Sequence, residues 1–138
     1  MNAIEEQNKS TVIRFNKEVI ENGNLNSFDE LVSDDVTNHT AQAGMDRGAK
    51  GMKYFLMEIL RAGFPDLKVE IMEQVAERDL VTTRKKITGT HTGSILNLPP
   101  SNKTVTINII DMIRLKNGKY IDHWGASNFS DVIKEISG

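Results

Sequence analysis

The chain has 138 residues, of which 17 are basic and 19 acidic, so its formal net charge is −2. This near balance gives no general attraction for nucleic-acid phosphates or anionic lipid, and the absence of cysteine excludes disulfides, thiolate nucleophiles and cysteine-ligated zinc. The polar N-terminal segment lacks the apolar core of a signal peptide, and no stretch reaches the roughly 20 apolar residues of a membrane helix. We expect one globular domain over residues 1–138, in the cytoplasm, without a nucleic-acid or membrane partner.

The first half of the chain predicts three helices, because its apolar side chains recur at helical spacing. The positions that define them are Val12, Phe15, Val19 and Ile20 in the first helix, Leu25, Phe28, Leu31 and Val32 in the second, and Met52, Phe55, Leu56, Ile59 and Leu60 in the third. Gly23 and Pro65 follow the first and third helices at positions typical of helix ends. The polar stretch 33–51 is predicted as a loop.

The second half predicts strands that are rich in β-branched residues. They span residues 68–76, 80–90, 104–115 and 119–127, and a short helical turn is expected near residues 131–136. The stretch 91–103 contains Gly93, Pro99 and Pro100 and is predicted as a loop. Helices followed by a meander of strands predict an α+β fold, in which the helices cover one face of an antiparallel sheet.

Asn117 and Gly118 give the strongest local signal, because both tolerate the positive φ of a type I′ turn and so predict a hairpin. An uninterrupted ladder counted from this turn pairs Lys116 with Lys119, Ile113 with Asp122, Asp111 with Trp124, Ile109 with Ala126 and Ile107 with Asn128. These side chains then share one face of the sheet, and His123 lies on the opposite face. A bulge would shift this register and turn Asp111 outward.

Asp111 is the candidate that this pattern singles out, because it is one carboxylate within an apolar stripe. Desolvation there raises the pKa of a carboxyl group and suits it to proton transfer. The alternative is a structural role, in which Asp111 caps a backbone amide or forms an ion pair with Arg84. Lys85 and Lys86 are interpreted as a solvated strand edge, rather than as amines in a desolvated pocket that could form a Schiff base.

The histidines are further candidates. His91 lies in the compact segment Gly89–Gly93, where it either titrates near neutrality or bonds the backbone of a turn. His39 follows a polar stretch and either lines the mouth of a pocket or caps its loop. Because His39, His91 and His123 lack a local ligand spacing such as His-x-x-x-His, we predict no metal site.

Several segments from about His39 to Asn128 together resemble the SnoaL-like polyketide cyclase family, of the nuclear-transport-factor-two-like superfamily. They are Asn38-His39, Phe64-Pro65-Asp66-Leu67, Glu77-Arg78-Asp79-Leu80-Val81, Gly89-Thr90-His91-Thr92-Gly93, Leu98-Pro99-Pro100 with Lys103, and Asn117-Gly118-Lys119 through Asp122-His123-Trp124. The resemblance implies a cone-shaped, curved antiparallel sheet wrapped around N-terminal helices, with a ligand cavity between them, and a homodimer. It also implies ring closure of a polyketide ester by an intramolecular aldol reaction, in which a pocket carboxylate removes a proton alpha to a carbonyl. No metal or organic cofactor is implied.

Carried onto this chain, the resemblance gives Asp111 or Asp122 as the base. Trp124 would stack on a small hydrophobic or carbonyl-containing ligand, and the polar ligand contacts would come from Asn128, His39, Arg84 and His91. Many family members have aspartate at the position of Asn128, and asparagine cannot act as a base. Three functions therefore stay open: a cofactor-independent cyclase or isomerase, a non-catalytic ligand-binding module, and an interaction or dimer-forming domain.

Overall fold

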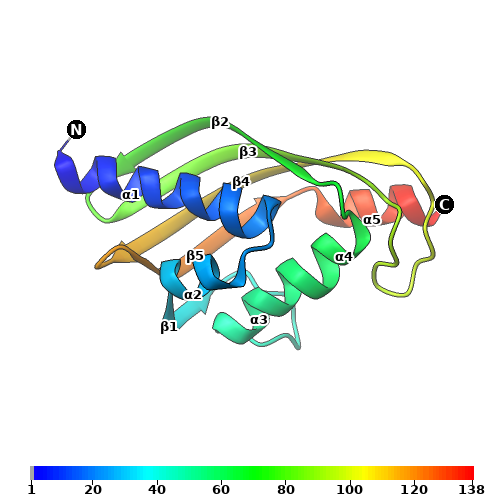
Figure 1. Ribbon diagram of the computed structural model, residues 1–138, viewed down its shortest axis with the longest axis horizontal. Helices are drawn as coiled ribbons and strands as arrows, with labels where there is room; N and C mark the ends of the chain where they lie inside the picture. The colour runs from blue at the N-terminus through cyan, green and yellow to red at the C-terminus, as the bar shows by residue number, and fades with distance from the viewer. Residues whose placement is uncertain (1) are drawn as a thin grey trace.

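The sheet of this protein curls around its helices, as the computed structural model describes for residues 2–138 (Figure 1). The helical segments are α1 (Ala3–Arg14), η1 (Phe15–Glu21), α2 (Leu25–Leu31), α3 (Ala49–Tyr54), η2 (Phe55–Leu60), α4 (Arg61–Gly63) and α5 (Phe129–Ser137). The strands are β1 (Val32–Asn38), β2 (Lys68–Glu77), β3 (Leu80–Thr90), β4 (Thr104–Lys116) and β5 (Lys119–Ser127). The π-helical segment η1 continues α1, and we call α1 and η1 together the α1 rod. The segment η2 joins α3 to α4, and we call these three together the α3 rod.

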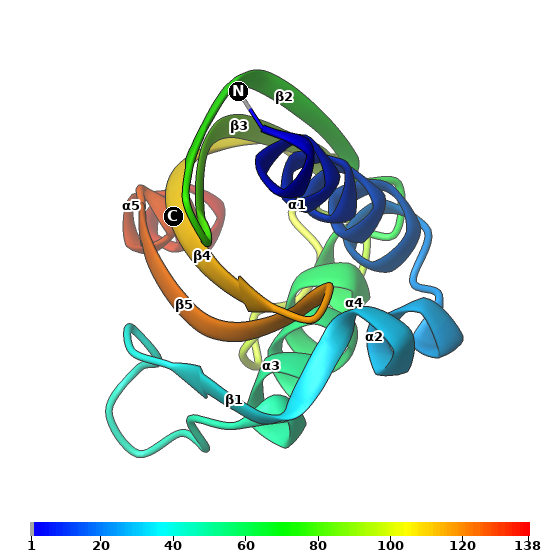
Figure 2. The same cartoon turned by 90° about the vertical axis from the view of Figure 1, so that its left-hand side faces the viewer.

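The strands lie in the order β1-β5-β4-β3-β2, with β1 parallel to β5 and every other neighbouring pair antiparallel. Seen from one end of the molecule, the concave face of the sheet curves around the two rods (Figure 2). This arrangement confirms the expected α+β fold with a curved sheet around N-terminal helices. The last helix, α5, lies at the same end of the molecule as the 91–103 loop (Figure 1).

The predicted loop over residues 33–51 is wrong in its first part, because β1 occupies Val32–Asn38. Only two side chains of β1, Val32 and Val36, are buried, and the register with β5 shifts within the strand. Two apolar side chains separated by three polar ones give no alternating pattern, so the local sequence does not reveal the strand. The edge of β5 supplies the hydrogen-bond partners of β1, and this pairing brings Asn38 beside β5.

The end of η1 is fixed by Gly23 and Arg61. Gly23 has a φ of 69°, a left-handed conformation that glycine adopts at little cost. A Cβ atom at Gly23 would lie 2.6 Å from Nε of Arg61, whose guanidinium donates to the carbonyl oxygens of Ile20 and Glu21. Glycine therefore leaves room for the side chain that satisfies free carbonyl groups at this helix end. The predicted end of the first helix at Gly23 is confirmed.

The hairpin of β4 and β5 turns at Asn117 and Gly118, whose φ values are 53° and 76°, as the sequence predicts. Beyond the turn the register shifts, and Ile121 of β5 has no partner on β4. This extra residue forms a β-bulge. Relative to an uninterrupted ladder, a bulge moves every later side chain of its strand to the other face of the sheet.

The bulge overturns most of the predicted pairs. The observed pairs are Asp111–Gly125, Ile113–His123 and Ile109–Ser127, in place of the predicted Asp111–Trp124, Ile113–Asp122, Ile109–Ala126 and Ile107–Asn128. His123 therefore lies on the concave face, whereas Asp122 and Trp124 lie on the convex face. Asp111 keeps its place on the concave face, because the ladder between β3 and β4 is unbroken.

The core lies between the concave face and the two rods, and it is mostly apolar. Several buried polar residues interrupt it, and among them are Asn16, Thr83, Lys85 and Asp111. Burial of a polar group is unfavourable unless hydrogen bonds replace those to water, so this cluster needs an explanation.

Among residues 2–138, no helix combines the length and the apolar character that crossing a bilayer requires.

Candidate functional site

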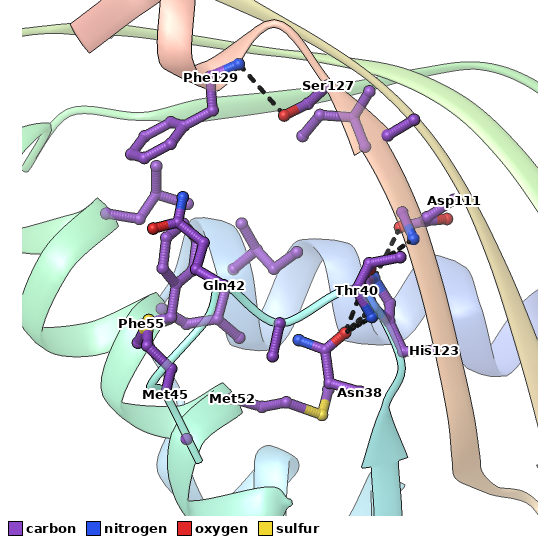
Figure 3. A pocket seen from close by; sticks show the side chains of 18 of the residues that line it. Asn38, Thr40, Gln42, Met45, Met52, Phe55, Asp111, His123, Ser127 and Phe129 are labelled. Atoms are coloured by element: carbon purple, nitrogen blue, oxygen red, sulfur yellow. Dashed lines mark hydrogen bonds and ion pairs between the residues drawn. The ribbon is translucent and has the colours of Figure 1, made fainter. Parts of the chain in front are cut away.

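A cavity of about 230 Å³ lies between the concave face of the sheet and the two rods (Figure 3). Its apolar walls are formed by Phe15, Ile20, Met45, Met52, Phe55, Leu56, Leu60, Ile87, Ile109 and Phe129. Four polar side chains, those of Asp111, His123, Asn38 and Thr40, lie together on one side, whereas Gln42 and Ser127 line the cavity elsewhere (Figure 3). An apolar body with one polar side is typical of sites for small amphipathic molecules.

A buried ion pair forms the base of the polar side. Nζ of Lys85 lies 3.1 Å from Oδ2 of Asp111, and the two side chains are 4% and 6% exposed. The same ammonium group donates a hydrogen bond of 2.6 Å to Oδ1 of Asn16 on η1. Asn16 in turn donates to the carbonyl oxygen of Val12 at 2.8 Å, which keeps its own oxygen turned toward Lys85. Lys85 is therefore held from two sides by partners on separate elements.

The second carboxylate oxygen of Asp111 is unsatisfied. Among the residues that the structure describes, Oδ1 of Asp111 is buried and has no hydrogen-bond partner. An unpaired buried acceptor is destabilising. Its position beside a cavity therefore points to a role in function rather than in stability.

His123 extends the polar groups toward β1. Its Nδ1 lies 2.8 Å from Oδ1 of Asn38, and that oxygen also accepts a hydrogen bond of 3.2 Å from the backbone N–H of Thr40. Because the Thr40 amide can only donate, the Asn38 atom is the carbonyl oxygen, and Nδ1 of His123 carries the proton. Nε2 then has a free lone pair, and it lies 3.9 Å from Oδ2 of Asp111 (Figure 3).

The surroundings of His123 keep its ring neutral. Burial lowers the pKa of the imidazole from its usual value of 6.5, the charge of Asp111 raises it, and the charge of Lys85 lowers it. The net effect is a lowered pKa, so the ring is unprotonated at pH 7. A neutral imidazole with a free nitrogen can accept a proton, and the carboxylate of Asp111 would stabilise the imidazolium that forms.

Gly125 provides the space that the imidazole needs. A Cβ atom there would lie 3.0 Å from Cε1 and 3.4 Å from Nε2 of His123, and 3.8 Å from Cβ of Asp111. The backbone N–H of Gly125 donates a hydrogen bond of 2.9 Å to Oγ1 of Thr40, which fastens the loop after β1 to β5. Contact with the ring, rather than an unusual backbone conformation, therefore accounts for glycine at this position.

Tyr120 is a further polar residue of the cavity lining. Its ring is 2% exposed and packs against Phe15, with the ring centroids 4.5 Å apart. Burial, together with the charge of Asp111, raises the pKa of the Tyr120 phenol well above its usual value of 10. The hydroxyl group therefore stays protonated and can act as a neutral hydrogen-bond donor.

Asp122, Trp124 and His39 lie together, but outside the cavity. Nε2 of His39 lies 2.7 Å from Oδ1 of Asp122, and the His39 ring stacks on Trp124 with centroids 4.6 Å apart and planes 7° apart. Arg114 completes this convex-face cluster, with Nε 3.4 Å from Oδ2 of Asp122. The expectation that Asp122 and Trp124 face the same cavity as Asp111 is wrong, and the reason is the bulge in β5.

The strand-edge interpretation of residues 84–86 is wrong for the middle residue. Arg84 is exposed and pairs with Glu73, with Nε 2.7 Å from Oε1, so the suggested ion pair with Asp111 does not form. Side chains alternate along β3, and Lys85 therefore points into the core while its two neighbours point away. Lys85, and not Arg84, is the cation beside Asp111.

His91 and Asn128 also lie outside the cavity lining. Nδ1 of the buried His91 accepts a hydrogen bond of 3.1 Å from the N–H of Ser101, which matches the alternative of a structural histidine in a turn. Oδ1 of Asn128 accepts one of 2.8 Å from the N–H of Asn108, just before α5 begins. The asparagine in place of the family's aspartate therefore removes no carboxylate from this cavity.

Several residues at or beside the polar side were not predicted as site residues, among them His123, Lys85 and Asn16. The alternation of β3 contains the signal for Lys85, because Val81, Thr83 and Ile87 share its face. Asn16 interrupts the apolar stripe of the first helix beside Phe15. His123 has no such signal, because its orientation depends on a bulge that the local sequence does not announce.

The comparisons with known proteins agree with this fold. A family model for SnoaL-like polyketide cyclases matches residues 10–136. A Jannaschia sp. CCS1 protein, proposed to be a SnoaL-like polyketide cyclase, is 27% identical, with a TM-score of 0.86 over 100% of this chain and 96% of that chain. IdmH from Streptomyces antibioticus, proposed to be a polyketide cyclase, is 24% identical, with a TM-score of 0.81 over 96% and 99% of the two chains. A protein from Acidithiobacillus ferrooxidans, also proposed to be a polyketide cyclase, is 22% identical, with a TM-score of 0.81 over 98% and 97%.

The last two likenesses concern the fold alone, because their identities are low. No curated protein matched the chain. The family model, however, covers nearly the whole sequence. This chain belongs to the SnoaL-like polyketide cyclase family.

Proposed function

We propose that this protein removes a proton alpha to a carbonyl group and closes a ring by intramolecular aldol addition, without a cofactor. The observation that carries the proposal is the free Nε2 of a neutral His123 on the polar side of an apolar cavity. Membership of the SnoaL-like polyketide cyclase family supports the reaction type. The apolar walls favour a small hydrophobic ligand that carries carbonyl groups.

The base in this proposal is His123 rather than Asp111 or Asp122. Oδ2 of Asp111 is engaged by Lys85, and its Oδ1 is buried. Asp122 bonds His39 on the convex face. Asp46 also lines the cavity, and its Oδ2 accepts hydrogen bonds from the backbone N–H groups of Gly48 and Gly51. We assign the proton transfer to Nε2 of His123, because it is an unpaired nitrogen of a neutral ring on the polar side of the cavity.

The proposed reaction is an isomerisation whose atoms balance within one substrate molecule. Nε2 of His123 takes the proton from the alpha carbon, and the C–H electron pair forms an enolate. Asp111, 3.9 Å from Nε2, stabilises the imidazolium. Tyr120 donates a hydrogen bond to a carbonyl oxygen on which negative charge develops. The enolate carbon then attacks the second carbonyl of the same molecule, and the resulting alkoxide recovers the proton from His123.

Proton exchange on a simple ketone tests the first step. We would incubate the protein with 2-tetralone in deuterated buffer and follow the loss of the alpha-proton signals by NMR. Wild type should accelerate exchange over buffer, and His123→Gln should lower the enzymatic rate by at least about 100-fold, the scale of general base catalysis. Asp122→Asn is the comparison variant, because it removes one of the two carboxylates that the family resemblance gives as the base.

Two results would contradict the proposal. The first is wild-type exchange in His123→Gln, which would remove His123 from the mechanism. The second is a thermal shift on adding 2-tetralone without any acceleration of exchange, which would identify a non-catalytic binding module. The ring-closing step is then tested with an aryl β-keto ester that carries an aldehyde, whose cyclised product has the mass of the substrate.

A further inference from the structure

We propose that Lys85 binds carbonyl compounds covalently, with Nζ condensing with a ketone or aldehyde in the cavity to give a protonated imine. Among residues 2–138, Lys85 is the one buried lysine, and it lines the cavity. The chain has no cysteine thiol that could compete for the same carbonyl. The proposal shares the carbonyl ligand of the proposed function but does not depend on proton abstraction by His123.

The position of Lys85 supports a reacting amine rather than a purely structural one. Its stem passes through the apolar core, and its head is held at 2.6 Å by Oδ1 of Asn16 and at 3.1 Å by Oδ2 of Asp111. A lysine whose only role was stability could be replaced by an apolar residue together with its partner, because a buried ion pair rarely stabilises more than good apolar packing. Here the pair instead borders a cavity that a ligand can enter.

Asp111 provides the route for the proton that must leave before the amine can attack. Nζ of Lys85 passes this proton to Oδ2 across the ion pair. The amine lone pair then forms a C–N bond, and the π electrons of the carbonyl move to its oxygen. That oxygen takes one proton from nitrogen and one from Asp111, and it departs as water while the C=N bond forms. The sum converts a carbonyl and an ammonium group into an iminium group and one water, and no oxidant or reductant is needed.

Charge conservation makes the product acceptable in this buried place. The iminium nitrogen carries the same single positive charge as the ammonium, so the carboxylate of Asp111 has a cationic partner both before and after the reaction. An adduct that neutralised the lysine would leave Asp111 as an uncompensated buried charge, which is strongly unfavourable. The iminium group also acidifies the neighbouring alpha protons.

The test uses 1-phenylbutane-1,3-dione, whose aryl group suits the apolar walls. Its iminium adduct loses the central proton to give a conjugated enaminone, which absorbs in the ultraviolet and is stable enough for peptide mapping. We expect wild type to gain the mass of one diketone less one water, on the peptide that contains Lys85. Lys85→Arg keeps a cation for Asp111 but cannot form an imine, and it should label at least about tenfold more slowly.

Lys86→Arg is the matched control, because Lys86 is the next residue of β3 and faces away from the cavity. It should label like wild type. The inference is overturned if saturating diketone leaves Lys85 unmodified in wild type, or if the label spreads over exposed lysines and survives in Lys85→Arg. Peptide mapping of the wild-type protein shows whether Lys85 is modified, even if a variant folds poorly. A His123→Gln protein that still labels Lys85 but no longer exchanges 2-tetralone protons separates this inference from the proposed function.

Discussion

Asp111 and Gly125 lie directly opposite each other on β4 and β5. The imidazole of His123 occupies the space that a side chain at position 125 would need. The imidazole of His123, a residue that pairs with Ile113, therefore leans toward the position at which Asp111 faces Gly125. Neither residue alone explains the site. Their closeness depends on a glycine two residues after the histidine.

Gly125→Ala should displace the His123 ring without unfolding the protein. The new Cβ would lie 3.0 Å from Cε1 of the ring, closer than ordinary contacts, so the imidazole must move. We expect the exchange rate on 2-tetralone to fall by at least about tenfold, while the urea midpoint changes little. A Gly125→Ala variant with the wild-type exchange rate would show that the position of the His123 ring is not critical. Gly48→Ala, at a glycine that also lacks a positive φ and whose added Cβ would come no closer than 3.4 Å to its neighbours, is the control for the loss of glycine itself.

The pKa of His123 should be lower than 6.5, its usual value, because burial disfavours the imidazolium. Between 6.5 and the lower folded-state pKa, the unfolded chain binds more protons than the folded chain. The contribution of the neutral His123 to the free energy of unfolding should therefore be fully present above this interval, and it should decrease as the pH falls through the interval. NMR titration of the ring measures the pKa, and Asp111→Asn should lower it further, because the charge of Asp111 raises it. A midpoint above 6.5 in wild type would contradict the neutral base.

Breaking the buried ion pair should be costly, and removing both partners should not. Lys85→Met or Asp111→Leu alone leaves one buried charge without its partner, and each should lower the free energy of unfolding by about 3–5 kcal/mol. The double variant should recover most of this loss, since two apolar side chains can pack against each other. Urea unfolding of the four proteins measures the coupling. Additive losses would show that the two groups do not interact.

Gly23→Ala should destabilise the protein more than Gly44→Ala does. Both glycines have positive φ, 69° and 86°, so both substitutions strain the backbone. Only at Gly23 would the new Cβ overlap the guanidinium of Arg61 that bonds the end of η1. We expect a loss of about 1 kcal/mol at Gly44 and at least about twice that at Gly23. Equal losses of stability for the two variants in thermal unfolding would show that the contact with Arg61 does not contribute.

The sequence predicts those parts of the fold that local chemistry determines. The helix end at Gly23 and the turn at Asn117 and Gly118 follow from residues that tolerate positive φ, and Asp111 lies on the concave face as its apolar neighbours indicate. The family resemblance adds the curvature of the sheet, which no single segment encodes.

The rest depends on contacts that are distant in the chain. β1 forms a strand because it pairs with the edge of β5. His123 faces the cavity because Ile121 is unpaired and shifts the register of β5. A run of three basic residues resembles a solvated edge, although the alternation of side chains along β3 places its middle member, Lys85, inside the fold. In this segment the periodicity of the strand, and not its charge, indicates which side chain is buried.

The bulge at Ile121 also bears on how members of this family are compared. Asp122, His123 and Trp124 are adjacent, and the bulge decides which of them faces the cavity. If the same residues were laid flat against β4, His123 would face outward and its two neighbours inward. Two relatives with identical letters in this segment can therefore present opposite chemistry to their substrates. Transferring an activity between such relatives requires matching the kink in the strand before matching the amino acids.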